Sequence, residues 1–371
     1  MNQDKPKALV FFQYLPPWRI DVFNEMAKYY QLTIAFTDAE IDGFSYNREL
    51  LLSQLNPEIK TIFLSKGFRI GSRPIRFGVY DLIKSIEPHI IFSHEYSPTS
   101  ILVATYKKIK LFDYQYVITT SDNVGIAESV GGLKAIFRNY VLSNSNAIIV
   151  YSEAVKKFYQ KAYPFLRVAI CPNIQNPVTL LKHRNCFDSI LKYYKTKFEL
   201  NDVKIILYTG RLSFVKGIDL LLDAFSKSFN DGYKLVLVGE GSEKENLMQQ
   251  CKDLNIEDKV VFASFYSGRE LYAWYDLANL YILPSRYEPF GAVVNEALVY
   301  GCQVMASKFI GAIDFINDSN GVLFNPLNEK EFITTLNDFY KKLDLVENKK
   351  TDLMIVSFDS YVNVFNEIYI S

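Results

Sequence analysis

The sequence predicts an α/β protein built from two doubly wound domains. Its 371 residues exceed what one ordinary hydrophobic core accommodates. Short apolar runs bounded by turn residues alternate with amphipathic stretches, which is typical of parallel strands covered by helices on both faces. The alternation starts again after Pro172-Asn173 and Pro177. We therefore expect a linker over residues 171–178, made stiff by its two prolines.

The predicted strands place the candidate ligand-binding residues of each half at one edge of its sheet. Two such halves facing one another bind ligands at the carboxyl ends of their strands, in the cleft between them. A first helix is expected over residues 20–30. The predicted strands are 8–12, 32–36, 61–64, 90–92, 116–119 and 147–150 in the first half, and 205–208, 234–238, 260–263, 280–283 and 303–306 in the second.

Composition narrows the classes of partner. Basic and acidic residues number 41 each, so the overall charge predicts no nucleic-acid partner. Up to Pro172 there are 20 basic and 15 acidic residues, which suits an anionic acceptor or a membrane surface and is also compatible with chance. The four cysteines show no Cys-x-x-Cys spacing, as expected in a reducing cytosol. No apolar run reaches the length of a signal-peptide core or a membrane span, so we expect a cytoplasmic protein that at most touches the inner membrane face.

A loop with two cations follows the predicted strand 205–208. Gly210 lets the chain turn sharply, and Arg211 and Lys216 stand five residues apart across the loop. Both cations can reach a diphosphate, and they stabilise a phosphate leaving group increasingly as its negative charge develops. A solvated arginine and a lysine at a helix entry are the simpler interpretation of these residues alone.

The segment 284–292 predicts a turn that leads into a helix over 293–300. A proline and a glycine mark the turn. The backbone N–H groups of Phe290, Gly291 and Ala292 would then point out of the helix start. Such groups bind anions and sugar hydroxyls without a charged side chain.

Two glutamates accompany this turn. Glu288 precedes the predicted helix, and Glu296 lies two turns later among apolar residues, where a carboxylate needs partners. An ion pair with Arg286 or Lys308 and a bidentate hydrogen bond to a ribose diol are equally good interpretations. The Gly-x-Gly at 239–241 adds weak evidence, because a plain strand-to-helix turn explains it.

In this order the pieces resemble the retaining glycosyltransferase family 4 of the group 1 glycosyltransferases, which has the GT-B fold. The resemblance covers most of residues 205–326, through the Gly-Arg-x4-Lys-Gly loop, LVGEGSEKENL and the Glu-x7-Glu motif in EPFGAVVNEALVYG. It implies two Rossmann-like domains facing across a cleft. The N-terminal, acceptor-binding domain would span 1–172 with a C-terminal helix at 359–371 packed back on it, and the donor-binding domain would span 179–358.

The resemblance also implies a function and a site. The chain would transfer a sugar, with retention, from a nucleotide-diphosphate sugar to a saccharide or lipid-linked acceptor in cell-surface polysaccharide synthesis. Arg211 and Lys216 would grip the diphosphate, Glu288 would lie beside the transferred sugar, and Glu296 would bind the ribose. No metal ion or other cofactor is implied, and the chain contains no Asp-x-Asp triplet. Further donor contacts are implied at Gly210, Ser264, Phe265, Phe290, Gly291 and Ala292.

Three positions on the acceptor side depart from the family pattern or stay open. The turn after the first strand lacks the glycine pair of many relatives, and Arg19 there either replaces that contact, binds the acceptor or is a solvated helix-start residue. Asp122 stands near the place of a family histidine, although turn chemistry also explains an Asp-Asn pair. His94 follows another strand and either lines the cleft or is structural.

A basic and aromatic segment, 66–80, favours a flexible basic loop and is also compatible with peripheral membrane association. Two alternatives to a transferase remain. One is a catalytically silent nucleotide-sugar-binding protein, and the other is a GT-B phosphorylase or epimerase.

Overall fold

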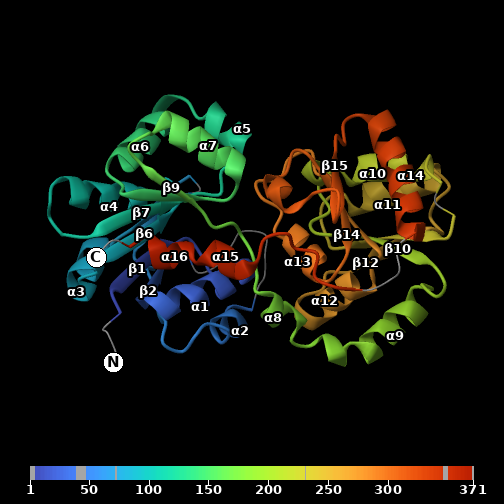
Figure 1. The fold of residues 1–371 in the computed structure, drawn as a ribbon, viewed down its shortest axis with the longest axis horizontal. Helices are drawn as coiled ribbons and strands as arrows, with labels where there is room; N and C mark the ends of the chain where they lie inside the picture. Colours follow the sequence, from blue (N-terminus) through green and yellow to red (C-terminus); the bar gives the residue numbers. More distant parts are fainter. Residues whose placement is uncertain (1–4, 39–46, 72, 230, 346–349, 370–371) are drawn as a thin grey trace. The chain divides into compact units, whose positions relative to one another are not determined.

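The computed structural model describes residues 5–38, 47–71, 73–229, 231–345 and 350–369 (Figure 1). The chain divides into two compact units. The N-terminal unit comprises Met1–Gln175 together with Ser357–Ser371, and the C-terminal unit comprises Asn176–Val356.

The N-terminal unit is built on a seven-stranded parallel sheet in the order β3-β2-β1-β6-β7-β8-β9. Its strands are β1 (Lys7–Phe12), β2 (Gln31–Phe36), β3 (Lys60–Phe63), β6 (Ile90–His94), β7 (Gln115–Thr119), β8 (Ala147–Val150) and β9 (Arg167–Ile170). Its helices are η1 (Pro17–Arg19), α1 (Ile20–Tyr29), α2 (Arg48–Leu52), α3 (Val79–Ile86), α4 (Pro98–Lys108), α5 (Val124–Ser129), α6 (Gly132–Ser143), α7 (Glu153–Ala162), α15 (Phe358–Val362) and α16 (Val364–Glu367).

Both faces of this sheet are buried because side chains alternate along each strand. On β1, Leu9 and Phe11 belong to the core shared with helices α3, α4, α6 and α7. Phe12 points the other way and meets Phe23 of α1 edge to face, with ring centroids 5.5 Å apart. Near-continuous apolar strands are therefore required, as the sequence pattern indicated.

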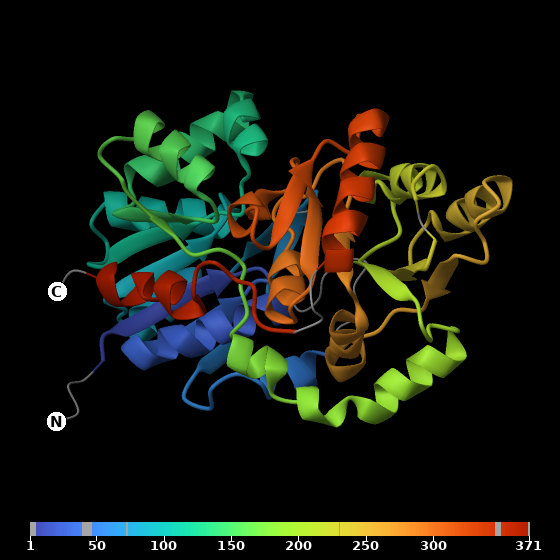
Figure 2. The ribbon, with the colours of Figure 1, turned by 45° about the vertical axis from the view of Figure 1, so that its right-hand side comes forward.

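The C-terminal segment completes the N-terminal unit. Helices α15 and α16 contact α1, and Figures 1 and 2 show these red helices beside the blue α1. The Tyr30 hydroxyl donates to the Phe365 carbonyl at 2.5 Å, and the Phe365 ring lies 6.0 Å from that of Phe92 on β6. Phe365 is buried, so it contributes to the core on this face of the sheet.

The predicted flexible basic loop is instead an antiparallel hairpin. Strands β4 (Gly67–Ile70) and β5 (Arg73–Arg76) pair with each other. Arg69 and Arg76 form ion pairs with the buried Asp38, at 2.9 and 2.7 Å. These contacts order a segment that sequence composition alone favoured as a loop.

The C-terminal unit holds a six-stranded parallel sheet in the order β12-β11-β10-β13-β14-β15. Helices α10, α11 and α14 form one contacting group, and α9, α12 and α13 form another (Figure 1). The strands are β10 (Lys204–Thr209), β11 (Tyr233–Val238), β12 (Val260–Ala263), β13 (Leu280–Leu283), β14 (Gln303–Ser307) and β15 (Gly321–Phe324). The helices are α8 (Pro177–Leu181), η2 (Arg184–Cys186), α9 (Asp188–Lys197), η3 (Phe214–Lys216), α10 (Ile218–Ser226), α11 (Lys244–Asp253), α12 (Gly268–Leu277), α13 (Val293–Val299), η4 (Gly311–Phe315) and α14 (Glu329–Leu345).

Every predicted strand is present, but β9 and β15 were not predicted. Both are four-residue edge strands with mixed burial, so their apolar pattern is weak. The second proline of the expected linker also differs from the prediction. Pro177 is the first residue of α8, where the Asn176 side chain accepts from the Val178 amide at 2.9 Å, so this part of the linker is helical.

We expect Phe365→Ala to destabilise the N-terminal unit by about 3 kcal/mol, because it empties a buried aromatic site. The chain has two tryptophans, Trp18 and Trp274, one in each unit. Urea unfolding followed by Trp18 fluorescence in a Trp274→Phe background therefore reports on the N-terminal unit alone. The exposed Asn366→Ala is the control, and an unchanged midpoint for Phe365→Ala would show that the C-terminal segment lies outside that cooperative unit.

Candidate functional site

The direction of chain connections reverses in the C-terminal unit between β10 and β13. Strand β10 pairs with β11 on one side and with β13 on the other. In doubly wound sheets, ligands bind outside the carboxyl ends of the strands at such a reversal. The loops that follow β10 and β13 are the two that carry the predicted cations and Glu288.

Lys216 and Glu288 form an ion pair across this reversal. Lys216 ends η3, Glu288 lies in the loop after β13, and their side chains are only 21% and 15% exposed. The two loops also join through the backbone, because the Arg286 amide donates to the Val215 carbonyl at 2.8 Å. The structure thus brings together two residues that are 72 positions apart in the sequence.

A glycine is required where these loops touch. Gly217 has a φ of +65°, and a Cβ there would lie 2.2 Å from the Pro284 carbonyl oxygen. Any side chain would push the two loops apart. The contact between Lys216 and Glu288 therefore depends on the absence of a side chain at the residue that follows Lys216.

Arg286 braces the same junction. Its guanidinium makes two 2.6 Å hydrogen bonds to the Asp219 carboxylate and lies over the Phe214 ring, 4.0 Å from the centroid. This bidentate geometry is the strong form of an arginine–carboxylate contact. The suggestion that Arg286 pairs with Glu296 is therefore wrong, because its charge is directed to Asp219.

Arg211 and Glu288 act on one buried hydroxyl. Tyr208 of β10 is fully buried, and its hydroxyl donates to the Arg211 carbonyl at 2.9 Å. Burial raises the pKa of Tyr208 well above its usual value, Tyr281 and Glu288 raise it further, and Arg211 lowers it. Both predicted site charges therefore lie close to the end of β10, with Arg211 on the exposed side.

Glu296 lies beside a cluster of hydroxyl groups that the sequence analysis missed. The Thr209 hydroxyl is 2.7 Å from that of Tyr275 and 3.2 Å from that of Tyr281. Burial raises the pKa of Tyr275 well above its usual value, and the nearby Glu296 carboxylate adds to the shift. Burial also raises the pKa of Tyr281, with contributions from Glu296 and Glu288. The sequence signals that could have indicated this cluster were Tyr281 within the apolar strand β13 and Thr209 at the end of the neighbouring strand β10.

The Gly-x-Gly after β11 supports the cation loop mechanically. A Cβ at Gly239, whose φ is +151°, would lie 1.9 Å from the Gly210 carbonyl oxygen. The Leu212 amide donates to the Glu240 carbonyl at 2.9 Å. The Gly-x-Gly segment is thus a strand-to-helix turn whose backbone packs closely against the loop that carries Arg211.

The remaining donor-side predictions are spread along the same sheet edge. Ser264 and Phe265 follow β12 and are exposed. The Phe290 ring is buried and meets Phe315 edge to face, so its side chain belongs to the core. Gly291 and Ala292 directly precede α13.

Arg19 and His94 belong to the N-terminal unit, at its own reversal between β1 and β6. Arg19 is only 2% exposed and donates to the Pro172 carbonyl at 3.3 Å, so the solvated interpretation is wrong. His94 stacks on Phe12, with ring centroids 4.2 Å apart, and its Nδ1 lies 2.9 Å from the Thr119 hydroxyl. Burial, with Arg19 as the second cause, lowers the pKa of His94 to about 3, so its imidazole is neutral.

Asp122 is held in a buried network at the end of β7. The Tyr159 hydroxyl donates to its carboxylate at 2.7 Å, and Tyr96 and Tyr159 hydroxyls lie 2.9 Å apart. Burial raises the pKa of Asp122, and Glu95 raises it further. Turn chemistry belongs to the next residue, Asn123, whose side chain accepts from Ile126 and begins α5.

Glu95 was not predicted, yet it organises this edge. Its carboxylate accepts from the Ser121 amide at 2.8 Å and from the Ser121 hydroxyl at 2.6 Å. Its φ of +58° is unusual for a glutamate and is typical of strained positions near functional sites. A glutamate after an apolar strand carries no sequence signal that separates it from an ordinary surface residue.

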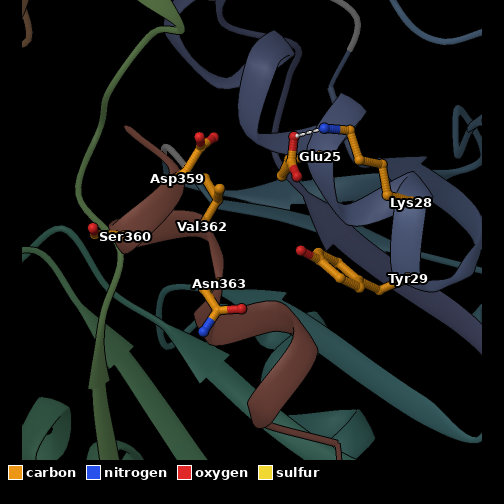
Figure 3. Close-up of a pocket in the computed structure, with 7 residues that line it drawn as sticks. All are labelled: Glu25, Lys28, Tyr29, Asp359, Ser360, Val362 and Asn363. Atoms are coloured by element: carbon orange, nitrogen blue, oxygen red, sulfur yellow. Dashed lines mark ion pairs between the residues drawn. The ribbon is translucent and has the colours of Figure 1, made fainter. Parts of the chain in front are cut away.

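A groove on the N-terminal unit contains none of the predicted site residues. It is an open groove between α1 and α15, shown in Figure 3, where Glu25 pairs with Lys28 at 2.7 Å opposite Asp359. In the described part of the chain, no three His, Cys, Asp or Glu side chains gather as candidate metal ligands. No helix over the described ranges is long and apolar enough to span a membrane.

Comparisons with known proteins find similar sequences over part of the chain and a similar fold over nearly all of it. Residues 193–351 match the family model for glycosyl transferases group 1. The chain is 35% identical over 159 residues to an uncharacterized glycosyltransferase of Methanocaldococcus jannaschii, covering 41% of each protein. It is 32% identical over 206 residues to the lipopolysaccharide 1,2-N-acetylglucosaminetransferase of Salmonella typhimurium, covering 52% of this chain and 53% of that protein. The chain thus aligns with about half or less of these relatives' length.

The solved structure of Anabaena HepE in complex with UDP superimposes with a TM-score of 0.73 at 18% identity, over 98% of both chains. HepE in complex with UDP-glucose gives a TM-score of 0.69 at 17% identity, again over 98% of both chains. The predicted fold of two Rossmann-like units is confirmed by this likeness and by the two parallel sheets.

Acid should destabilise the N-terminal unit through His94. Below its ordinary pKa of 6.5 the unfolded chain takes up a proton at this imidazole, whereas the folded unit does so only near pH 3. The contribution of this group to the free energy of unfolding is thus fully present above pH 6.5 and is lost as the pH falls. The loss reaches about 2–3 kcal/mol at pH 4.5.

We expect His94→Asn to flatten the dependence of unfolding free energy on pH between 6.5 and 4.5, measured by urea titration with Trp18 fluorescence. Comparing slopes cancels the contributions of other titrating groups. His183→Asn, at an exposed position of the other unit, should keep the parent slope. Equal slopes for parent and His94→Asn would contradict a neutral, buried imidazole.

Proposed function

We propose that the chain transfers a sugar from a nucleotide-diphosphate sugar to a saccharide or lipid-linked acceptor, because residues 193–351 match the family model for glycosyl transferases group 1. We further propose that transfer retains the anomeric configuration and serves the synthesis of a cell-surface polysaccharide. The observation that carries the proposal is the Lys216–Glu288 pair at the strand reversal, with Arg211 and Glu296 beside it.

The cations of this site suit a diphosphate leaving group. As the bond from the sugar carbon to the phosphate oxygen breaks, the electron pair stays on the diphosphate. Lys216 and Arg211, fixed by the loop after β10, would stabilise that growing charge more than the charge of the bound donor. The HepE structures are complexes with UDP and with UDP-glucose, which supports a nucleotide sugar as the ligand class.

Glu288 would act on the other side of the same bond. The sugar carbon becomes positive as the leaving group departs, and a carboxylate held nearby stabilises that charge. The acceptor hydroxyl would attack from the face that the diphosphate leaves, and its proton would pass to the departing phosphate oxygen. The ion pair with Lys216 holds the Glu288 side chain in one position, so its charge is in place before the donor arrives.

Glu296 would bind the ribose of the donor. A carboxylate accepts two hydroxyl groups at once, which matches a ribose diol. The Thr209, Tyr275 and Tyr281 hydroxyls beneath it would orient the carboxylate from below. Ser264 and Phe265, exposed at the same sheet edge, would then lie toward the base.

We propose that the N-terminal unit binds the acceptor. Arg19, His94 and Asp122 are each fixed by buried contacts, so we propose that they position the loops that meet the acceptor. These residues would act through the loops, while the exposed groups beside them would touch the sugar.

Substitutions of Glu288 and Glu296 should have different effects on kcat and on donor affinity. Glu288→Gln should lower kcat about 100-fold with donor affinity within a few fold, as for other preorganised charges at a reacting centre. Glu296→Gln should mainly weaken donor binding, because a ribose contact is made equally in ground and transition states. Initial rates and donor affinity by calorimetry distinguish the two outcomes.

The exposed Glu329→Gln is a matched control, because it removes a partner of Lys227 on the surface of the same unit. It should leave both constants unchanged. If Glu288→Gln transferred sugar at the parent rate, the assigned role would be wrong. Release of nucleotide only when acceptor is present, with the anomeric configuration of the product read by NMR, tests transfer with retention. Donor binding without release would favour a silent binding protein.

Transfer should also proceed without a divalent ion, because Arg211 and Lys216 would neutralise the diphosphate. We expect activity in excess EDTA to stay within about twofold of the activity with Mg²⁺, since protein cations already supply the stabilising charge. Loss of activity in EDTA that Mg²⁺ or Mn²⁺ restores would contradict this proposal.

A further inference from the structure

Glu95 lies near the middle of the carboxyl edge of the N-terminal sheet. It directly follows β6, which lies between β1 and β7 in the sheet order. Burial raises the pKa of Tyr14, which follows β1, and the pKa of Asp122, which follows β7, and the Glu95 carboxylate adds to both shifts. The carboxylate is therefore close to the loops after these neighbouring strands, where doubly wound sheets bind ligands.

The backbone of Glu95 is fixed in its left-handed conformation by hydrogen bonds on both of its polar groups. Its amide donates to the Thr119 carbonyl at 2.8 Å, and its carbonyl accepts from the Ser100 hydroxyl at 2.6 Å. A φ of +58° is unfavourable for a residue with a side chain, and it persists only where the surrounding structure imposes it. The fold, rather than a local preference, therefore sets the position from which the Glu95 side chain extends.

The Glu95 carboxylate is oriented by its neighbours and can still accept another hydrogen bond. Its Oε1 accepts from both the amide and the hydroxyl of Ser121. Among the described residues, its Oε2 accepts only from the Thr120 hydroxyl, at 3.3 Å. The two oxygens of a carboxylate offer about four acceptor positions. Because the side chain is 37% exposed, a ligand can donate to Oε2.

The charge of this carboxylate is not neutralised by a basic side chain. In the part of the chain that the structure describes, no lysine or arginine forms an ion pair with Glu95. The Nε2 atom of His94 lies 3.6 Å away, but burial lowers the pKa of this imidazole to about 3, so it is neutral. The accessible charge at Glu95 is therefore negative, and it repels a ligand group that is itself a carboxylate or a phosphate.

Arg73 of the β4–β5 hairpin is a cation that an acidic ligand could use at this edge. Its guanidinium donates at 3.1 Å to the carbonyl of Tyr96, the residue after Glu95, and Arg73 is exposed. A guanidinium suits a carboxylate or a phosphate, whereas a carboxylate suits a hydroxyl group. Substitutions of Arg73 and Glu95 therefore distinguish an acidic ligand from a neutral one.

We propose that the Glu95 carboxylate binds hydroxyl groups of an uncharged sugar, and that it selects an acceptor whose terminal residue is neutral over one that is acidic. This inference rests on the proposed function, in which the N-terminal unit binds the acceptor. A carboxylate that is already fixed loses little side-chain entropy when it accepts a hydroxyl group. The adjacent Thr120 and Ser121 hydroxyls are further hydrogen-bonding partners of the kind that a sugar uses.

Direct binding of simple glycosides to the full chain tests this inference without turnover. The probes are the methyl glycosides of glucose, galactose and mannose. Each is compared with the matching methyl uronide, in which a carboxylate replaces the hydroxymethyl group of the ring. Dissociation constants are measured by saturation-transfer NMR. We expect at least one neutral glycoside to bind, and its uronide to bind about tenfold more weakly because like charges repel.

Glu95→Gln should weaken binding of the neutral glycoside about tenfold, because a hydrogen bond to a charged acceptor is stronger than one to an amide oxygen. It should also remove most of the preference over the uronide. The glutamine oxygen can still accept from Ser121, so the loop after β7 keeps its support. Arg73→Gln should bind the neutral glycoside as the parent does. The same holds for Glu128→Gln, a control at an exposed position of α5 in the same unit.

These measurements separate the inference from the proposed function. Weaker glycoside binding by Glu95→Gln supports a sugar site at this edge even in a chain that transfers no sugar. A chain that transfers sugar, but whose Glu95→Gln variant binds glycosides as the parent does, overturns the inference alone.

Three further results would also overturn it. One is that no neutral glycoside binds, and another is that the uronide binds more tightly than its neutral partner. The third is that Glu95→Ala loses binding while Glu95→Gln keeps it, because Glu95 would then only support the loop of Ser121. An unchanged urea unfolding midpoint, followed by Trp18 fluorescence in the Trp274→Phe background, shows that each variant is folded.

Discussion

The close approach of two loops at Gly217 is the constraint on which the candidate site depends. The Cα of this glycine faces the Pro284 carbonyl with no room for a side chain. Because the loops after β10 and β13 meet there through backbone atoms, Lys216 and Glu288 are held in one place rather than sampling solvent. The Arg286–Asp219 ion pair also links the loop after β13 to helix α10, which follows the loop after β10. Charges that are fixed before a ligand arrives stabilise a developing charge without first reorganising.

The sheets were predictable from the sequence because buried parallel strands leave a strong local signal. Ile205–Tyr208 and Leu280–Leu283 are almost entirely apolar, and each ends at turn residues, so their place in the fold was clear. The edge strands β9 and β15 were missed because their residues are only partly buried, and the β4–β5 hairpin was missed because β4 is exposed along its whole length. These strands are stabilised by contacts with residues distant in the chain. In the hairpin, for example, Arg69 and Arg76 form ion pairs with Asp38.

The candidate site was predictable only in part, for a related reason. Lys216 and Glu288 each stand at the end of a recognisable strand, so their meeting at one edge follows from topology. Their direct pairing, and the diversion of Arg286 to Asp219, depend on side-chain geometry that local spacing does not encode. The Thr209, Tyr275 and Tyr281 hydroxyls come from two strands and a helix, and only the folded sheet brings them together. Glu95 depends on a left-handed backbone conformation that its sequence context does not announce.

The return of the C-terminal segment to the N-terminal unit has a consequence for how the chain is made. Residues 357–369 leave the ribosome after the whole of the C-terminal unit, yet Phe365 is part of the N-terminal core. The usual order, in which the first domain folds first during synthesis, is therefore inverted. The second unit is contiguous and can finish folding while the first still exposes the apolar face of β6 that awaits its last helices. During that interval the nascent first unit is the part of the chain that most needs protection from aggregation.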